Sequence, residues 1–298
     1  DRTGAGKEGQ PYEEAMSQLR SDYPKHADFV ESLIAEFGIE DEAESYKEPD
    51  GDPRDRTVKR QVDAIFDEQV PVFAAGLGDP AWVVPIAKEA GAKVMGLSGS
   101  VRNAERQLKA GVDIVVAQGT EAGGHTGKIA TMPLVPQIVD AVDPTPVVAA
   151  GGIADGRGIA AALTLGAEGV WLGTAFLASK ESQIHKTQQD AIIAGHSGEF
   201  EISRSYTGKT ARQFRNPIVE AWENSGLTPL PMPLQGILMA KLGSAAEKAG
   251  RHDLVFTPSG QASGLIREAR PASVIMEHLV TSTIECLDNL KYRVATTI

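Results

Sequence analysis

The amino-acid sequence predicts an α/β fold, a (β/α)8 barrel whose first three strands are absent from this chain, followed by a mainly helical C-terminal region. Short apolar runs begin near residues 70, 93, 113, 146 and 169, so their starts lie 20 to 33 residues apart, the length of a strand–helix unit. Each run ends at glycine, serine or glutamine. Such bounded apolar runs are typical of strands that are buried on both faces, as in a parallel sheet.

The individual elements follow from local patterns. The expected strands are 70–75, 93–97, 113–117, 146–150 and 169–172, and the expected helices between them are 57–68, 80–90, 101–110, 132–142 and 157–165. Gly91, Gly111 and Gly166 each stand where a helix should end, and a left-handed C-cap favours a residue without a Cβ. Asp155 and Ser179 are expected to cap the helices after the last two strands.

Five strand–helix units fit either a barrel or a doubly wound sheet. A dinucleotide-binding sheet would carry GxGxxG directly after a strand, and GGIADG at 151–156 matches that pattern only loosely and late in the chain. A barrel instead places a phosphate site in the loops after its last two strands. Gly151-Gly152 and Gly173-Thr174 follow the last two expected strands. We therefore expect strands four to eight of a barrel, and a chain that begins after the first three.

The remaining segments divide the chain into three expected regions. Residues 1–56 form an acidic insert with one helix at 24–37 and a charged linker at 40–55, and residues 57–179 form the barrel portion. Residues 180–298 form a second, mainly helical domain with helices near 181–194, 234–249, 261–267 and 271–290. Proline prevents the segment 228–233 from continuing a helix. Arg212, Arg215, Tyr206 and Gln261 are candidates for facing the pocket.

Composition excludes several kinds of partner. The 298 residues are 42% hydrophobic and carry a net charge of −11, which argues against nucleic acid and anionic membranes as partners. The single cysteine, Cys286, and the lack of clustered cysteine or histidine predict neither a disulfide framework nor a metal site. No transmembrane or signal-peptide run is present. We expect a cytoplasmic protein, and a homodimer stays open.

The stretch DIVVAQGTEAGGHTG, residues 113–127, carries the candidate catalytic loop. His125 follows the C-terminal end of a strand, where parallel α/β folds bind ligands. Gln118 ends the strand with a side chain that both donates and accepts hydrogen bonds. Gly123 and Gly124 allow a bound group to approach the backbone closely.

Five motifs resemble those of one enzyme family. They are QGTEAGGHTG (118–127), AAGGIADGRG (149–158), VWLGTAFLASKES (170–182), TGKTARQFRNP (207–217) and GQASGLI (260–266). In this order they resemble the nitronate monooxygenases, or 2-nitropropane dioxygenases, which are FMN enzymes on a TIM barrel with an added helical domain. The resemblance covers roughly residues 55–285.

The resemblance implies a site and a reaction. Gly151, Gly152, Gly173 and Thr174 would hold the FMN phosphate, and Trp171-Leu172-Gly173-Thr174 would contact the flavin through the backbone, with the Trp171 side chain in the core. Gln118 would meet the polar edge of the flavin or its ribityl chain, next to Gly123 and Gly124. His125 would deprotonate a nitroalkane or stabilise its nitronate, and O₂ would yield a carbonyl compound and nitrite.

Two alternatives stay open. EAGGHTGKIATMPLV (121–135) is also similar to the FMN-dependent enoyl-[acyl carrier protein] reductases, and a quinone reductase is related to both. Reduction of the flavin by NAD(P)H would distinguish these enzymes from a nitronate monooxygenase. A non-catalytic flavoprotein fragment is the third hypothesis, and it predicts a protein without a yellow cofactor.

Overall fold

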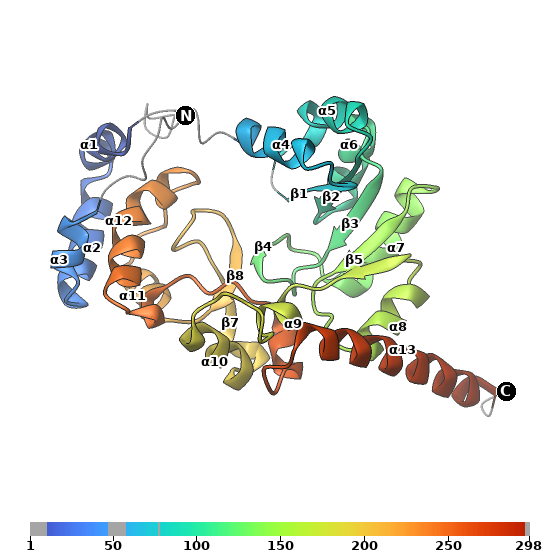
Figure 1. Cartoon of the computed structure of the whole chain (residues 1–298). Helices are drawn as coiled ribbons and strands as arrows, with labels where there is room; N and C mark the ends of the chain where they lie inside the picture. Colours follow the sequence, from blue (N-terminus) through green and yellow to red (C-terminus); the bar gives the residue numbers. More distant parts are fainter. Residues whose placement is uncertain (1–10, 47–57, 77, 296–298) are drawn as a thin grey trace. The chain divides into compact units, whose positions relative to one another are not determined.

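The chain divides into two compact units whose limits differ from the expected regions. A computed structural model describes residues 11–46, 58–76 and 78–295 (Figure 1). One unit, the barrel unit, comprises residues 62–200 and 258–298, and the other, the helical unit, comprises residues 1–61 and 201–257. The chain thus leaves the barrel unit after Phe200 and returns at Pro258. Local patterns along the sequence carry no information about such a return, which depends on packing between distant segments.

A parallel sheet forms the centre of the barrel unit. Its strands are β1 (Val72–Ala75), β2 (Lys93–Ser98), β3 (Ile114–Gln118), β5 (Val147–Ala150) and β6 (Gly169–Trp171). Neighbouring strands pair in parallel, and their order across the sheet, β1-β2-β3-β5-β6, is also their order along the chain. A doubly wound sheet would reverse this order at a switch point. Because no reversal occurs among these strands, the predicted barrel order is confirmed over the doubly wound alternative.

The helices that precede and connect these strands cover one face of the sheet. They are α4 (Val58–Asp67), η1 (Pro80–Trp82), α5 (Val84–Glu89), α6 (Val101–Ala110), α7 (Thr131–Val142) and α8 (Gly156–Thr164). Ala117, Ala149 and Val170 pack in one apolar cluster with residues of α6, α7 and α8. Because successive strand residues point to opposite faces, Gln118, Ala150 and Trp171 face away from the helices.

Helix ends in the barrel unit test the capping predictions. Gly91, Gly111 and Gly166 have φ of 75°, 93° and 95°, so the predicted left-handed caps are confirmed. The Asp155 side chain accepts hydrogen bonds from the amides of Arg157 and Gly158 at 3.0 and 3.2 Å, which confirms its cap of α8. The prediction for Ser179 is wrong. Helix α9 (Thr174–Leu177) ends before it, and α10 (Lys186–Ala194) is capped by the side chain of His185.

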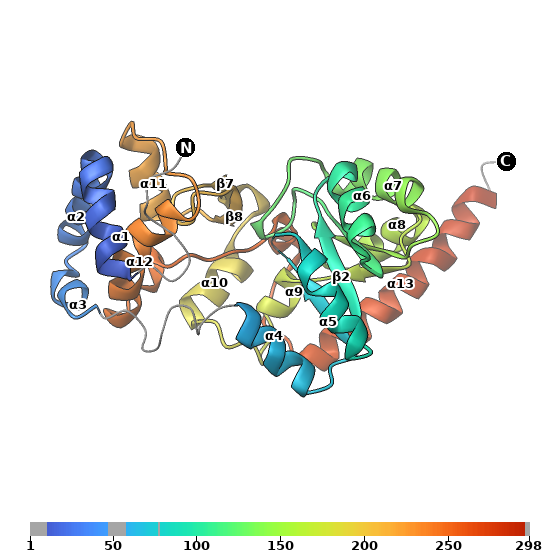
Figure 2. The ribbon, with the colours of Figure 1, turned by 90° about the horizontal axis from the view of Figure 1, so that it is seen from above.

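The C-terminal helix returns to the barrel unit. Figure 2 shows α13 (Ala272–Ala295) beside α8, and the two helices touch at Gly156. A Cβ at Gly156 would lie 2.3 Å from the backbone nitrogen of Thr283, so only glycine fits. The Gly156 amide also donates to Ser282 Oγ at 3.2 Å. Before α13, the expected helix at 261–267 is a short 3-10 turn, η4 (Gln261–Leu265).

The helical unit contains elements that the sequence did not predict. Helix α2 (Pro24–Glu36) confirms the helix expected at 24–37, and α12 (Leu234–Lys248) the helix expected at 234–249. Helices α1 (Tyr12–Asp22) and α11 (Pro217–Asn224) were not expected, and α3 (Glu40–Glu44) occupies the start of the predicted linker. Residues 47–55 of that linker lie outside the described residues. Leu19, Leu33, Ile218 and Leu242 are fully buried in the core of this unit.

Two strands that the sequence did not predict lie in the mainly helical segment after residue 180. They are β7 (Phe200–Ser203) and β8 (Ala211–Phe214), which are neighbours in a second, small sheet. The sequence of β8, ARQF, is polar although Arg212 and Gln213 are buried, so it lacks the apolar alternation that predicts a strand.

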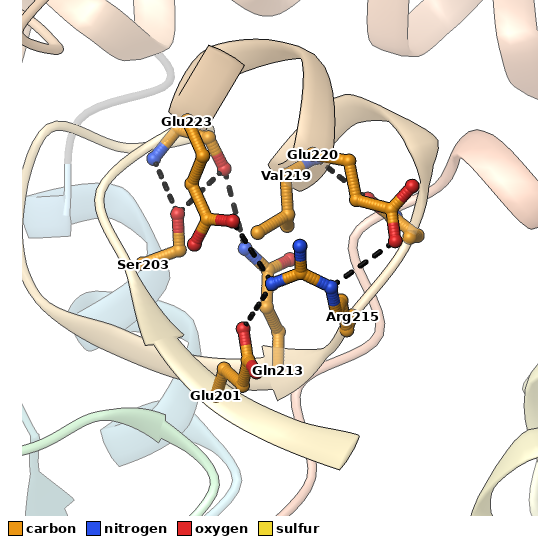
Figure 3. A network of polar contacts seen from close by, with 9 residues as sticks. Glu201, Ser203, Gln213, Arg215, Val219, Glu220 and Glu223 are labelled. Carbon is orange, nitrogen blue, oxygen red and sulfur yellow. Dashed lines mark hydrogen bonds and ion pairs between the residues drawn. The ribbon is translucent and has the colours of Figure 1, made fainter.

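A network of ion pairs connects β7 and β8 to α11 (Figure 3). Arg215 lies 2.7 Å from Glu201, 3.1 Å from Glu220 and 2.9 Å from Glu223. Tyr206 donates to the Leu254 carbonyl at 2.7 Å and accepts from Asn216 at 2.8 Å. These two candidate pocket residues therefore make polar contacts within the helical unit.

None of the helices in the described ranges combines the length and apolar character needed to cross a membrane.

Candidate functional site

A cavity of about 350 Å³ lies at the C-terminal ends of β3, β5 and β6, within the range of small-molecule sites. It is lined by Gln118, Glu121, Ala122, Gly123, Gly124, Ala150, Gly151, Gly152, Ile153, Trp171, Gly173, Thr174, Leu177, Pro258, Gly260 and Ala262. All of them belong to the barrel unit. Ligands of barrel enzymes bind at this end of the sheet, so the cavity has the position of an active site.

A larger hollow of about 520 Å³ lies elsewhere in the barrel unit, between α8 and α13. It contains Asp155 and Arg157 at the start of α8 and His278 and Cys286 on α13. This hollow is in the helical layer rather than at the strand ends. The smaller cavity is therefore the candidate site.

Most residues that the sequence singled out for a cofactor surround this cavity. Gln118, Gly123, Gly124, Gly151, Gly152, Trp171, Gly173 and Thr174 line it. Leu172 does not belong to the lining, because its side chain packs in the apolar cluster with α7 and α8. His125 is half-buried in β4 (Gly124–His125), one residue beyond the cavity wall at Gly124.

Trp171 corrects an expectation about the core. Its side chain was expected to pack in the core, but Trp171 is 37% exposed and lines the cavity. The residues on either side, Val170 and Leu172, both pack against the helices. Alternation along the strand therefore directs the indole to the face that holds the cavity.

Several lining residues were not predicted. Glu121, Ala122, Ile153 and Leu177 adjoin predicted residues in the same loops. Pro258, Gly260 and Ala262 come from a segment far along the chain, and the motif GQASGLI was the only signal for them.

The turn after β5 can be formed only by glycine. Gly151 and Gly152 have φ of 99° and 75°, a region that other residues rarely adopt. A Cβ at Gly151 would lie 2.9 Å from the Gly119 carbonyl oxygen. We call this turn the glycine corner. It presents backbone without side chains to the cavity.

Two further glycines join the walls of the cavity to each other. A Cβ at Gly123 would lie 2.6 Å from the carbonyl carbon of Ser259, and one at Gly260 would lie 2.6 Å from the carbonyl oxygen of Glu121. The loop after β3 therefore contacts the segment 258–262 backbone to backbone. Gly123 thus has a packing role in addition to the room for a ligand that was expected of it.

Hydrogen bonds also hold the segment 258–262 against its two neighbours, the start of α9 and the loop after β3. The Gly260 amide donates to Thr174 Oγ1 at 2.9 Å, and the Gln261 amide donates to the Glu121 carbonyl at 3.0 Å. Because Thr174 Oγ1 accepts this bond, its own hydrogen can be donated to a ligand.

The polar groups of the cavity are few. Among the lining residues that the structure describes, none has a basic side chain, Glu121 is the acidic one, and Gln118 and Thr174 supply an amide and a hydroxyl. An anionic group would therefore be held by backbone amides and the Thr174 hydroxyl rather than by lysine or arginine. The apolar and glycine surface suits a large ring system with a polar edge.

Comparisons with known proteins identify the family of the chain. The family model described as "Nitronate monooxygenase" matches residues 18–282. A Mycobacterium tuberculosis protein named as a monooxygenase is 38% identical over 277 residues, which is 89% of this chain and 74% of that protein. A Staphylococcus aureus protein named as a nitronate monooxygenase is 39% identical over 233 residues, covering 74% of this chain and 65% of that protein.

Solved structures give the same fold. The nitroalkane oxidase from Streptomyces ansochromogenes matches with a TM-score of 0.75 and 31% identity, over 89% of this chain and 78% of that chain. FabK from Thermotoga maritima matches with a TM-score of 0.71 and 34% identity, over 79% of this chain and 75% of that chain. From the family match and these relatives, the chain belongs to the nitronate monooxygenase family of flavin-dependent oxidoreductases.

Proposed function

We propose that the cavity binds FMN and that the protein oxidises alkyl nitronates with O₂ to carbonyl compounds and nitrite. The observation that carries this proposal is the gathering of the sequence-selected residues around one cavity at the strand ends. The nitroalkane oxidase of Streptomyces ansochromogenes, at a TM-score of 0.75, supports the substrate class.

The glycine corner and Thr174 fit the phosphate of FMN. Gly151, Gly152 and Gly173 offer backbone amides without side chains, and the Thr174 hydroxyl retains a hydrogen to donate. The protein carries a net charge of −11, so its overall field opposes an anion. Local donors must therefore outweigh that field at the glycine corner.

The flavin ring has a polar edge and a flat apolar face. We assign Gln118 to the edge and Trp171 to the face. Gln118 is partly buried at the cavity, and its amide can donate to and accept from the polar edge of the ring. Trp171 offers a flat apolar surface of the kind that stacks on aromatic groups.

His125 is the proposed proton acceptor. A neutral imidazole can take the proton from the carbon next to a nitro group, and the resulting imidazolium can hold the nitronate by charge and hydrogen bonding. FMN, when bound, supplies the electron acceptor and the reactivity toward O₂. The protein would orient the nitronate and keep the proton on His125.

Anaerobic spectroscopy of the protein tests this proposal. Addition of an alkyl nitronate should bleach the flavin absorbance, while NADPH should leave it unchanged. His125→Ala should retain the flavin and lose turnover of nitroalkane, and His278→Ala on the exposed face of α13 serves as the matched control. Turnover by His125→Ala at the wild-type rate would rule out the assigned role.

The second candidate is an NAD(P)H-dependent reductase of enoyl thioesters or quinones. The likeness to FabK at 34% identity and a TM-score of 0.71 is the observation that favours it. Rapid anaerobic bleaching of the flavin by NADPH would establish this reading, and a protein purified without flavin would favour the non-catalytic hypothesis. The cytoplasmic location and the homodimer stay predictions from the sequence.

A further inference from the structure

Glu121 lines the cavity, but its carboxylate is directed at the start of helix α7. Its Oε1 and Oε2 accept hydrogen bonds from the Thr131 amide at 3.1 and 2.9 Å, and Oε2 lies 2.9 Å from Thr131 Oγ1. Thr131 is the first residue of α7, and the preceding residue, Ala130, has no side chain that could cap the helix. Glu121 therefore caps α7 from the loop after β3, where a negative charge is favoured.

The Thr131 hydroxyl connects this cap to the glycine corner. Thr131 Oγ1 lies 2.9 Å from the Gly151 carbonyl oxygen as well as 2.9 Å from Glu121 Oε2. A hydroxyl has one hydrogen, and an ionised carboxylate and a carbonyl both only accept. The hydroxyl thus lies between two acceptors and donates to one of them at a time, so the Gly151 carbonyl and the Glu121 carboxylate share one donor.

The glycine corner also packs directly on this pair. A Cβ at Gly151 would lie 3.1 Å from Thr131 Oγ1, and a Cβ at Gly152 would lie 3.2 Å from Glu121 Cβ. Glycines have no side chain to hold a turn and can adopt many conformations. The contacts below the corner must therefore fix its backbone.

We infer that Glu121 and Thr131 are positioning residues that hold the glycine corner in the conformation that binds the phosphate of the cofactor. This inference rests on the proposed function, and it assigns no contact with the cofactor to either side chain. It also explains how a carboxylate can line a cavity for an anion, because its oxygens are directed to the amide and hydroxyl of Thr131.

The inference predicts a loss of selectivity for FMN over riboflavin, which lacks the phosphate. Thr131→Val removes the hydroxyl and keeps the backbone amide, and Thr131→Ser keeps both. We expect Thr131→Val to bind FMN about tenfold more weakly, the effect of one hydrogen bond, with an unchanged affinity for riboflavin. Thr131→Ser should restore the wild-type selectivity.

Glu121 gives a second, independent series. Glu121→Ala removes the cap and should lower the affinity for FMN but not for riboflavin. Glu121→Gln keeps an oxygen that accepts from the Thr131 amide, so it should recover most of the selectivity. Titration of the flavin-free protein with each flavin, followed by fluorescence, measures the ratio of the two dissociation constants.

Each outcome decides the inference. A selectivity that falls in Thr131→Val and Glu121→Ala and returns in Thr131→Ser and Glu121→Gln supports it. An equal loss of affinity for both flavins would mean that the pair only stabilises the fold. Unchanged affinities for both flavins would mean that the glycine corner keeps its conformation without the pair. Either result overturns the inference. A wild-type protein without preference for FMN would instead refute the proposed phosphate site, and with it the inference.

Discussion

Replacing Gly123 by alanine should separate the two walls of the cavity. The added Cβ would lie 2.6 Å from the carbonyl carbon of Ser259, and an ordinary contact begins at 3.4 Å, so the loop after β3 or the segment 258–262 must move by 0.8 Å. The atoms that it meets belong to the backbone, which cannot rotate away as a side chain can. Gly123 does not have a left-handed backbone, so the cost is steric alone.

The expected magnitude follows from this overlap. Overpacking of this kind costs about 1–3 kcal/mol of the free energy of unfolding. If the same cost opposes the cavity conformation that binds flavin, the affinity for flavin falls by about 5- to 150-fold, since about 1.4 kcal/mol is tenfold. We therefore expect Gly123→Ala both to unfold at lower urea concentration and to bind FMN more weakly.

Gly91→Ala is the matched control. Gly91 has a φ of 75° and nothing within 4 Å of an added Cβ, so the substitution costs about 1–2 kcal/mol in backbone conformation without any steric overlap. It precedes the N-terminal end of β2, at the end of the sheet opposite the cavity. Urea denaturation and FMN titration of both variants separate stability from binding. An unchanged FMN affinity in Gly123→Ala, or an equal loss in Gly91→Ala, would refute the reasoning.

Three further predictions concern side chains. Binding of flavin should quench the emission of Trp171. In Trp171→Phe, the decrease in emission on adding flavin should therefore be much smaller, while the other two tryptophans continue to emit. Burial raises the pKa of Asp155, but hydrogen bonds from the Arg157 side chain and the Gly158 amide outweigh it and hold the pKa below its ordinary value. Asp155→Ala should therefore cost about 1 kcal/mol in urea denaturation above about pH 4, and this difference should vanish as the pH falls through the lowered pKa. Arg215→Met should lower the midpoint of urea denaturation of the helical unit slightly, and by less at high salt, because its three carboxylates are partly exposed.

The barrel portion was predictable because its signals are local. Strand β2 was expected at 93–97 and observed at Lys93–Ser98, and helix α6 was expected and observed at 101–110. Apolar runs identify strands that are buried on both faces, and a glycine with a positive φ ends a helix whatever the rest of the chain does. The glycine corner was predictable for the same reason, since two adjacent glycines after a strand require no knowledge of distant segments.

The features that the sequence did not predict depend on contacts between distant residues. Strand β8 is polar, and its burial follows from its neighbours rather than from its own residues. Gly123 was interpreted as room for a ligand, whereas the segment that it contacts, at Ser259, lies far along the chain. The contact of Glu121 with Thr131 likewise joins two segments ten residues apart, and no local pattern indicates it.

The position of Trp171 shows that alternation along a strand can outweigh residue type in predicting a site. An apolar run such as Val170-Trp171-Leu172 gives no sign of which face is the core, so a large indole was assigned to it. Once Val170 and Leu172 are known to pack against the helices, the two-residue period leaves Trp171 on the opposite face. The same period applies to Gln118 after Ala117 and to Ala150 after Ala149. Any contact of Leu172 with a cofactor must consequently be made by its backbone, because its side chain already belongs to the core.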